Sequence, residues 1–160
     1  MTISDQFLTF TSSDFIFSVQ ISVDVVEQMH QECICSAPKE TGGVLVGYYS
    51  EDLSSAYVIK MLGKSKHSII DRFSFVRKGR DYLQSLDKLW DQKQYYVGEW
   101  HYHPYSSSSP SPTDINTLLR LSSSEKLHCP EPILIIIGGQ KGAWDLSVSV
   151  FSKGERIILS

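Results

Sequence analysis

Short stretches of this chain either alternate between apolar and polar residues or are apolar throughout, and both patterns are typical of β-strands. The first two stretches, residues 6–11 and 15–21, flank a Ser-Ser-Asp turn and predict a β-hairpin. The pattern predicts a sheet with many strands. Further strands are predicted at residues 42–49, 56–62, 95–103, 134–137 and 144–151, with short ones at 73–76 and 156–159.

Three other segments place apolar residues at helical spacing. The first follows Ser22, which can cap a helix that runs through Cys33, and Pro38 closes this region. The second covers residues 77–92 and the third covers residues 113–121. Together these elements predict an α/β fold in the loose sense (α+β), with about three helices packed on a mixed sheet.

The composition predicts a soluble globular protein with a single domain over residues 1–160. Hydrophobic residues make up 41% and charged residues 21%, and the net charge of −3 argues against nucleic-acid and membrane partners. The N-terminus lacks the basic and apolar regions of a signal peptide, and the longest apolar run, residues 133–137, is too short to cross a bilayer. We therefore expect a cytoplasmic protein.

The cysteines agree with a reducing compartment, because their number is odd and no secretion signal precedes them. We expect all three to be small core residues: Cys33, Cys35 and Cys129. Basic residues gather in one part of the chain, against the single acid Asp71, and predict either a solvated surface or a patch that contacts an acidic partner. They are Lys60, Lys64, Lys66, Arg72, Arg77, Lys78 and Arg80.

Two histidines at the end of a predicted strand are candidates for metal ligands. Residues two apart in a strand project to the same side, so the imidazoles of His101 and His103 can share one metal ion. Trp100 and Tyr102 then face the other side of the sheet. Pro104 cannot continue the hydrogen-bond ladder of a central strand, so the strand should end there and leave the histidines accessible.

A catalytic zinc ion needs a third protein ligand and keeps its fourth position for water. Asp114 is the candidate, because it begins a helix after a Ser/Pro loop at residues 105–112 that is long enough to fold back. A purely structural alternative exists, since Ser111, Pro112 and Asp114 also suit the cap, first and third positions of a helix. That alternative does not explain why the histidine pair and the capping aspartate occur together at this distance.

The combined spacing resembles His-x-His-Pro-x₆-Ser-x₂-Asp, the signature of JAMM metalloproteases, also called the MPN or JAB (Mov34/PAD-1) family. All of the specified residues are present: His101, His103, Pro104, Ser111 and Asp114. The family pattern also has a glutamate before a glycine-containing strand, and Glu40 precedes Thr-Gly-Gly-Val-Leu-Val-Gly at that place. The resemblance covers about residues 18–151 and implies a mostly antiparallel sheet of the cytidine-deaminase-like kind.

The resemblance implies a zinc metalloprotease with one catalytic Zn²⁺, which makes hydroxide available at neutral pH. Its implied ligands are His101, His103 and Asp114. Glu40 would carry the proton from water to the leaving amine, and Ser111 would donate a hydrogen bond to the oxyanion. Glu99 is a rival base because it shares the strand face with His101, but the family pattern favours Glu40.

JAMM proteases mostly cleave isopeptide bonds made by ubiquitin-like proteins, or trim residues after a ubiquitin-like C-terminus. The chain most resembles stand-alone bacterial JAB deconjugating proteases encoded beside E1/E2-like enzymes, including those of anti-phage CBASS operons. The resemblance implies that it reverses E1/E2-like conjugation in antiviral defence, with a ubiquitin-like protein or a conjugated nucleotidyltransferase C-terminus as substrate. Alternatives are a processing peptidase for a sulfur-carrier protein, a RadC-like protein and a non-catalytic MPN scaffold.

Overall fold

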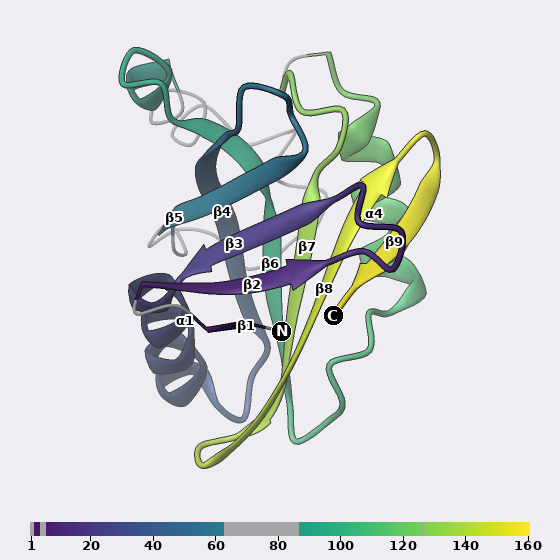
Figure 1. Cartoon of the computed structure of the whole chain (residues 1–160). Helices are drawn as coiled ribbons and strands as arrows, with labels where there is room; N and C mark the ends of the chain where they lie inside the picture. Colours follow the sequence, from purple (N-terminus) through teal and green to yellow (C-terminus); the bar gives the residue numbers. More distant parts are fainter. Residues whose placement is uncertain (1, 4–5, 63–86, 126) are drawn as a thin grey trace.

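The structure, a computed structural model, describes residues 2–3, 6–62, 87–125 and 127–160. Its strands form one sheet in the order β1-β2-β3-β5-β4-β6-β7-β8-β9 (Figure 1). β6, which carries the candidate histidines, lies in the middle of this sheet between β4 and β7. The strands are β1 Thr2–Ile3, β2 Phe7–Thr11, β3 Ser18–Ser22, β4 Thr41–Tyr49, β5 Ser55–Leu62, β6 Tyr95–Pro104, β7 Ile133–Gln140, β8 Ala143–Ser152 and β9 Glu155–Leu159.

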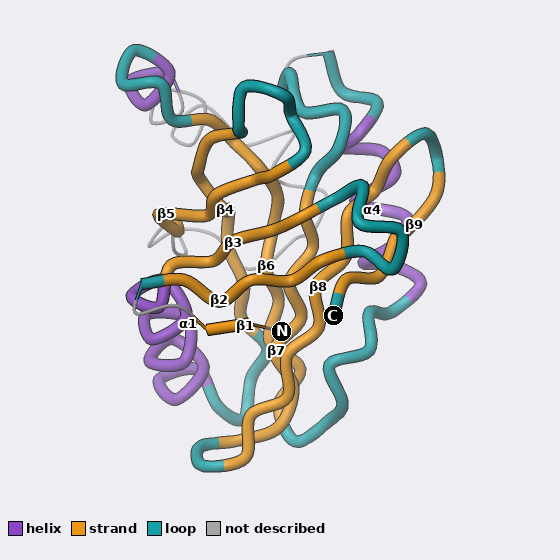
Figure 2. The backbone as a smooth tube through the Cα atoms, viewed as in Figure 1, coloured by secondary structure: helices purple, strands orange, loops and turns teal. Residues whose placement is uncertain are grey.

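The sheet is mixed and mostly antiparallel, as expected. Only β3 with β5 and β6 with β7 run parallel among the strands that the structure describes. The sheet also curls on itself, and β2 and β3 cross in front of β6, β7 and β8 (Figure 2). Thr11 and Ser160 exchange two backbone hydrogen bonds of 3.1 Å, so the end of β2 meets the residue that follows β9. This closure stabilises strands that would otherwise be free edges.

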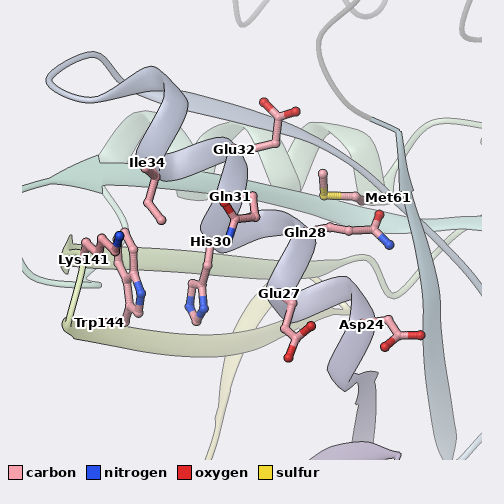
Figure 3. A pocket seen from close by; sticks show the side chains of 10 residues that line it. All are labelled: Asp24, Glu27, Gln28, His30, Gln31, Glu32, Ile34, Met61, Lys141 and Trp144. Atoms are coloured by element: carbon pink, nitrogen blue, oxygen red, sulfur yellow. The ribbon is translucent and has the colours of Figure 1, made fainter.

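Two described helices cover the sheet: α1 (Val23–Ser36) and α4 (Pro112–Ser122). α1 packs on β3, β4 and β5, whereas α4 packs beside β8. The outer side of α1 borders a pocket in which His30 stacks on Trp144, with ring centroids 4.8 Å apart (Figure 3). None of the helices in the described ranges combines the length and apolar character that a membrane crossing requires.

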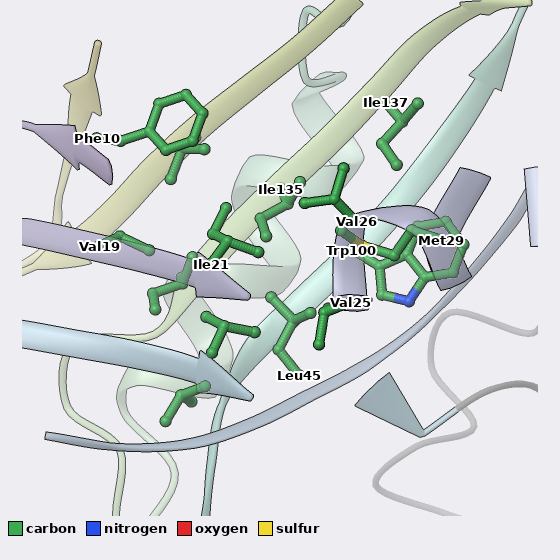
Figure 4. Packing of buried hydrophobic residues seen from close by; sticks show 14 of the residues in the cluster. Phe10, Val19, Ile21, Val25, Val26, Met29, Leu45, Trp100, Ile135 and Ile137 are labelled. Atoms are coloured by element: carbon green, nitrogen blue, oxygen red, sulfur yellow. The ribbon is translucent and has the colours of Figure 1, made fainter. Parts of the chain in front are cut away.

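A hydrophobic core fills each face of the sheet, and β7 contributes to both. Ile133, Ile135 and Ile137 belong to the core shared with α1, in which Figure 4 labels Ile135 and Ile137. Leu134 and Ile136 belong to the core shared with α4. A strand buried on both faces needs an unbroken apolar run, which is the pattern seen in its sequence.

The burial of Trp100 and Tyr102 shows which face of β6 is turned towards the core beneath α1. Both are at most 1% exposed and belong to the core beneath α1, as the alternation of β6 predicts. His101 and His103 therefore project to the opposite face, on the side of α4. The strand periodicity alone was sufficient to separate the candidate ligands from the core residues.

Most predicted elements agree with the structure, but two details were wrong. Ser22 occupies the N-cap of α1, yet its side chain makes no capping hydrogen bond. Cys33 and Cys129 are buried as expected, whereas Cys35 is exposed because it lies on the outward side of α1. The strand predicted at residues 73–76 lies outside the described residues. So do most of the basic cluster and most of the helix predicted at 77–92, of which residues 87–90 are helical.

Candidate active site

The candidate histidines lie near the C-terminal end of β6, where this central strand leaves the sheet. Their side chains are 15% exposed for His101 and 12% exposed for His103, so each is largely buried with one side open. Pro104 is the last residue of β6, which agrees with the predicted end of the strand. The sheet thus holds both imidazoles firmly and leaves them at its margin.

Asp114 meets both histidines although it lies on a different element. The chain folds back after β6, and α4 places the fully buried Asp114 carboxylate between the two rings. Its Oδ1 lies 2.7 Å from Nδ1 of His101, and its Oδ2 lies 3.4 Å from Nε2 of His103. The structure therefore brings together the three residues that the sequence singled out as metal ligands.

Ser111 caps α4 and contacts the same carboxylate. Its backbone N–H and its Oγ donate to Oδ2 of Asp114 at 2.7 and 2.6 Å, and the Asp114 N–H donates back to Ser111 Oγ at 3.2 Å. This is a complete capping box. The structural alternative considered for Asp114 is correct as far as it goes, and the same capping geometry turns the other carboxylate oxygen towards His101.

The electrostatics of the pair favour an ionised carboxylate beside a protonated imidazole. Burial raises the pKa of Asp114, but hydrogen bonds from His101 and Ser111 outweigh burial and hold that pKa well below its usual range. Burial lowers the pKa of His101, but the carboxylates of Asp114 and Glu99 outweigh it and raise the pKa to about 9. Because a metal binds neutral imidazole, metal binding has to displace this proton.

Glu99 lies on the inner side of His101. It is only 8% exposed, and its Oε2 is 3.6 Å from Nε2 of His101. His101 therefore stands between two carboxylates, with Asp114 on one side and Glu99 on the other. Nothing in the sequence beyond the shared strand face indicated that Glu99 is buried here.

Glu40 directly precedes β4, at the place expected from the family pattern. β4 pairs with β6 so that Thr41 is opposite Tyr102 and Gly42 is opposite His101. Continuing this antiparallel register by one residue places the exposed Glu40 across from His103. Glu40 therefore precedes the strand that lies next to the histidine-bearing end of β6.

Gly42 is a site residue that the sequence did not single out. A Cβ at this position would lie 2.4 Å from the carbonyl oxygen of Trp100 and 2.8 Å from Cδ2 of His101. Such contacts are far below ordinary van der Waals distances. Only glycine therefore lets the His101 ring lie against β4. The Gly-Gly pair after Glu40 is the sequence feature that could have indicated this close approach.

The chemistry of the converging side chains fits a zinc ion. Two imidazoles and one carboxylate are donors that catalytic zinc accepts, with a further position left for water. Within the described residues, however, no three His, Cys, Asp or Glu side chains are grouped so that they could hold a metal ion as they stand. His101 Nδ1 and Asp114 Oδ1 contact each other directly at 2.7 Å. The other described histidines lie elsewhere: His30 stacks on Trp144, and His128 lies at a tilt against Trp90. His67 is outside the described residues.

Comparison with known sequences identifies the family. Residues 22–148 match the family described as prokaryotic homologs of the JAB domain. A protein named "CD-NTase/cGAS isopeptidase" from Enterobacter hormaechei is 37% identical over 159 residues, which cover 99% of this chain and 87% of that protein. A protein named "Probable metalloprotease y4qB" from Sinorhizobium fredii is 30% identical over 139 residues, or 79% of each chain. The latter name describes that relative as a metal-dependent protease.

Comparison with solved structures agrees on the fold. Protein DSY2949 from Desulfitobacterium hafniense superposes with a TM-score of 0.62 at 16% identity, over 88% of each chain. A protein from Salinibacter ruber superposes with a TM-score of 0.51 at 19% identity, over 83% of this chain and 82% of that one. Taken with the sequence matches, these similarities show that the chain belongs to the family of prokaryotic JAB-domain homologues.

Proposed function

We propose that this JAB-family hydrolase, a deconjugating isopeptidase of the metalloprotease type, uses one zinc ion held by His101, His103 and Asp114. The observation that carries the proposal is the convergence of two imidazoles from β6 on the buried carboxylate of Asp114, within 2.7 and 3.4 Å. When bound, zinc acidifies a water molecule and polarises the scissile carbonyl. Asp114 supplies a permanently ionised ligand because its pKa is held low.

Two further residues act on the substrate in this proposal. Glu40, which directly precedes β4 beside the end of β6, takes the proton of the attacking water and delivers it to the leaving amine. Ser111 donates from its Oγ to the oxyanion that forms at the scissile carbonyl. In the resting structure that hydroxyl donates to Asp114 at 2.6 Å, so it has to turn from the carboxylate to the substrate.

The positions of the two glutamates support Glu40 as the base over Glu99. Glu40 is exposed at the start of β4, where water and substrate can reach it. Glu99 is buried against the inner side of His101, which suits a residue that orients the imidazole. A buried group on that side is far from an incoming substrate.

The substrate is a protein conjugated through its C-terminus. The relative from Enterobacter is named as an isopeptidase of CD-NTase/cGAS, and the chain matches it over 99% of its own length. We therefore propose an isopeptide bond formed by the C-terminus of a nucleotidyltransferase or a ubiquitin-like protein, made by an E1/E2-like enzyme and cleaved in the cytoplasm. The function in this proposal is reversal of such conjugation during anti-phage defence.

Metal analysis tests the site before any substrate is needed. Purified native protein should hold about one zinc ion per chain by plasma mass spectrometry, and His101→Ala and Asp114→Ala should lose it. A native protein that holds no zinc after reconstitution would contradict the proposed ligand set and favour a non-catalytic scaffold.

A cleavage assay then tests the substrate. The native enzyme should release a nucleotidyltransferase joined through its C-terminus to a lysine side chain, and Glu40→Gln should not. A sulfur-carrier protein with a C-terminal extension serves as the competing substrate. Cleavage of the extension alone would identify a processing peptidase instead of a deconjugating enzyme.

A further inference from the structure

We propose that Ser108 and Asp145 are positioning residues of the zinc site, which fasten the loop that joins His103 to Ser111. This inference rests on the proposed function, because it concerns the geometry of the same ligands. Asp145 lies on β8, two strands away from β6, and belongs to no part of the metalloprotease signature. Its link to the site is visible only in the folded protein.

A glycine on β7 makes room for the loop. His103 of β6 is paired with Gly138 of β7, and Gly138 is paired with Asp145 of β8, so all three share the site face of the sheet. A Cβ at Gly138 would lie 2.5 Å from the carbonyl oxygen of Ser106 and 2.6 Å from the backbone nitrogen of Ser108. The loop backbone therefore rests directly on the sheet, in the gap between His103 and Asp145.

Backbone hydrogen bonds hold the first half of the loop. The Tyr105 N–H donates to the Gly139 carbonyl at 3.0 Å, and the Gly139 N–H donates to the Ser106 carbonyl at 2.8 Å. These bonds extend the pairing of β6 and β7 beyond the end of β6. They fix the position of the start of the loop but not the position of Ser111 at its end.

Side chains of β8 hold the second half of the loop at Ser108. The Ser108 Oγ and N–H both donate to Oδ2 of Asp145, at 2.8 and 3.1 Å. Ser147 completes the attachment, because its Oγ donates to the Ser108 carbonyl at 2.6 Å. The two hydrogen bonds from Ser108 also lower the pKa of Asp145, so its carboxylate is ionised and is a strong hydrogen-bond acceptor.

Only one serine of the run at residues 106–109 takes part in this attachment. Ser108 is 7% exposed, whereas Ser106, Ser107 and Ser109 are all exposed. The serine-rich composition suggests a mobile loop, but the structure shows one anchored serine among three solvent-facing ones. The neighbours of Ser108 therefore provide matched controls of the same residue type.

The attachment acts on the zinc ligands through a short connection. Ser109 and Pro110 are the only residues between Ser108 and Ser111, and the proline ring restricts the backbone of that link. Ser111 in turn holds Oδ2 of Asp114 through two hydrogen bonds. Release of Ser108 would let the start of α4 drift, and Asp114 would lose its position between the histidines.

Two measurements separate a positioning role from general support of the fold: the affinity for zinc and the melting temperature of the zinc-free protein. Asp145→Ala and Ser108→Ala should weaken zinc binding by about 10–100-fold, as loss of a group that orients a ligand typically does. Affinity is measured by competition for Zn²⁺ with a chromogenic chelator. The melting temperature of the zinc-free protein should stay near that of the native chain, because Asp145 is exposed and outside both cores.

The controls are Ser107→Ala and Ser109→Ala, which should bind zinc like the native protein. Asp145→Asn keeps an oxygen that can accept from Ser108 and should recover most of the affinity. Native affinity in both Asp145→Ala and Ser108→Ala would overturn the inference while leaving the proposed function intact. Loss of zinc-free stability in parallel with affinity would also overturn it, since the contact would then support the whole fold. A native chain that binds no Zn²⁺ would reject the proposed function, and the inference with it.

Discussion

The ion pair of His101 and Asp114 should make the stability of the zinc-free protein decline between neutral and alkaline pH. The neighbouring carboxylates raise the pKa of His101 from 6.5 to about 9, against the opposing effect of burial. The folded state therefore binds this proton more tightly than the unfolded chain does. Its contribution to stability is complete below a pH of about 6.5 and is lost as the pH rises through about 9.

The size of this effect follows from the pKa shift. A change of one unit corresponds to about 1.4 kcal/mol, so the shift of His101 corresponds to roughly 3 kcal/mol. The side chain is 15% exposed, which keeps solvent screening small. For a chain of this length, roughly 3 kcal/mol corresponds to a change of roughly 6–12 °C in melting temperature.

The measurement is the melting temperature of chelator-treated protein across this pH range, followed by circular dichroism. His101→Gln serves as the reference because it lacks the titrating imidazole while keeping a polar side chain. The difference between native and variant protein should shrink as the pH rises through about 9. Parallel curves for the two proteins would refute the reasoning. Zinc-loaded native protein should lack the decline, because bound metal replaces the proton.

Four substitutions separate the roles of the remaining site residues. Gly42→Ala should destabilise the fold by about 1–3 kcal/mol, since its Cβ would lie 2.8 Å from Cδ2 of His101. Urea unfolding and metal analysis measure this, and native stability with full zinc content would contradict it. Ser111→Ala should lower kcat by about 10²–10³ with little change in KM, which steady-state kinetics can separate. Glu40→Gln should abolish cleavage and retain zinc, whereas Glu99→Gln should weaken zinc binding by about 10–100-fold. The reverse result for the two glutamates would make Glu99 the base.

Patterns within consecutive residues were enough to predict much of this protein. Strand alternation in β6 separated His101 and His103 from the buried Trp100 and Tyr102. The Ser-Pro-Thr-Asp sequence predicted the start of α4, and the capping box is formed as expected. These features are readable because each depends on the local geometry of one strand or one helix turn.

Other features depend on which strands become neighbours, and they appear only in the folded chain. The register between β4 and β6 brings the start of β4, which Glu40 precedes, to the end of β6, and Gly42 matters only because the His101 ring lies against it. Ser108 is anchored by Asp145, a partner 37 residues away. Register and loop paths result from long-range backbone pairing and close packing, and residues far apart in the chain carry no periodic signal of such contacts. The sequence by itself therefore determined the identity of the candidate ligands, and only the tertiary structure decided what holds them in place.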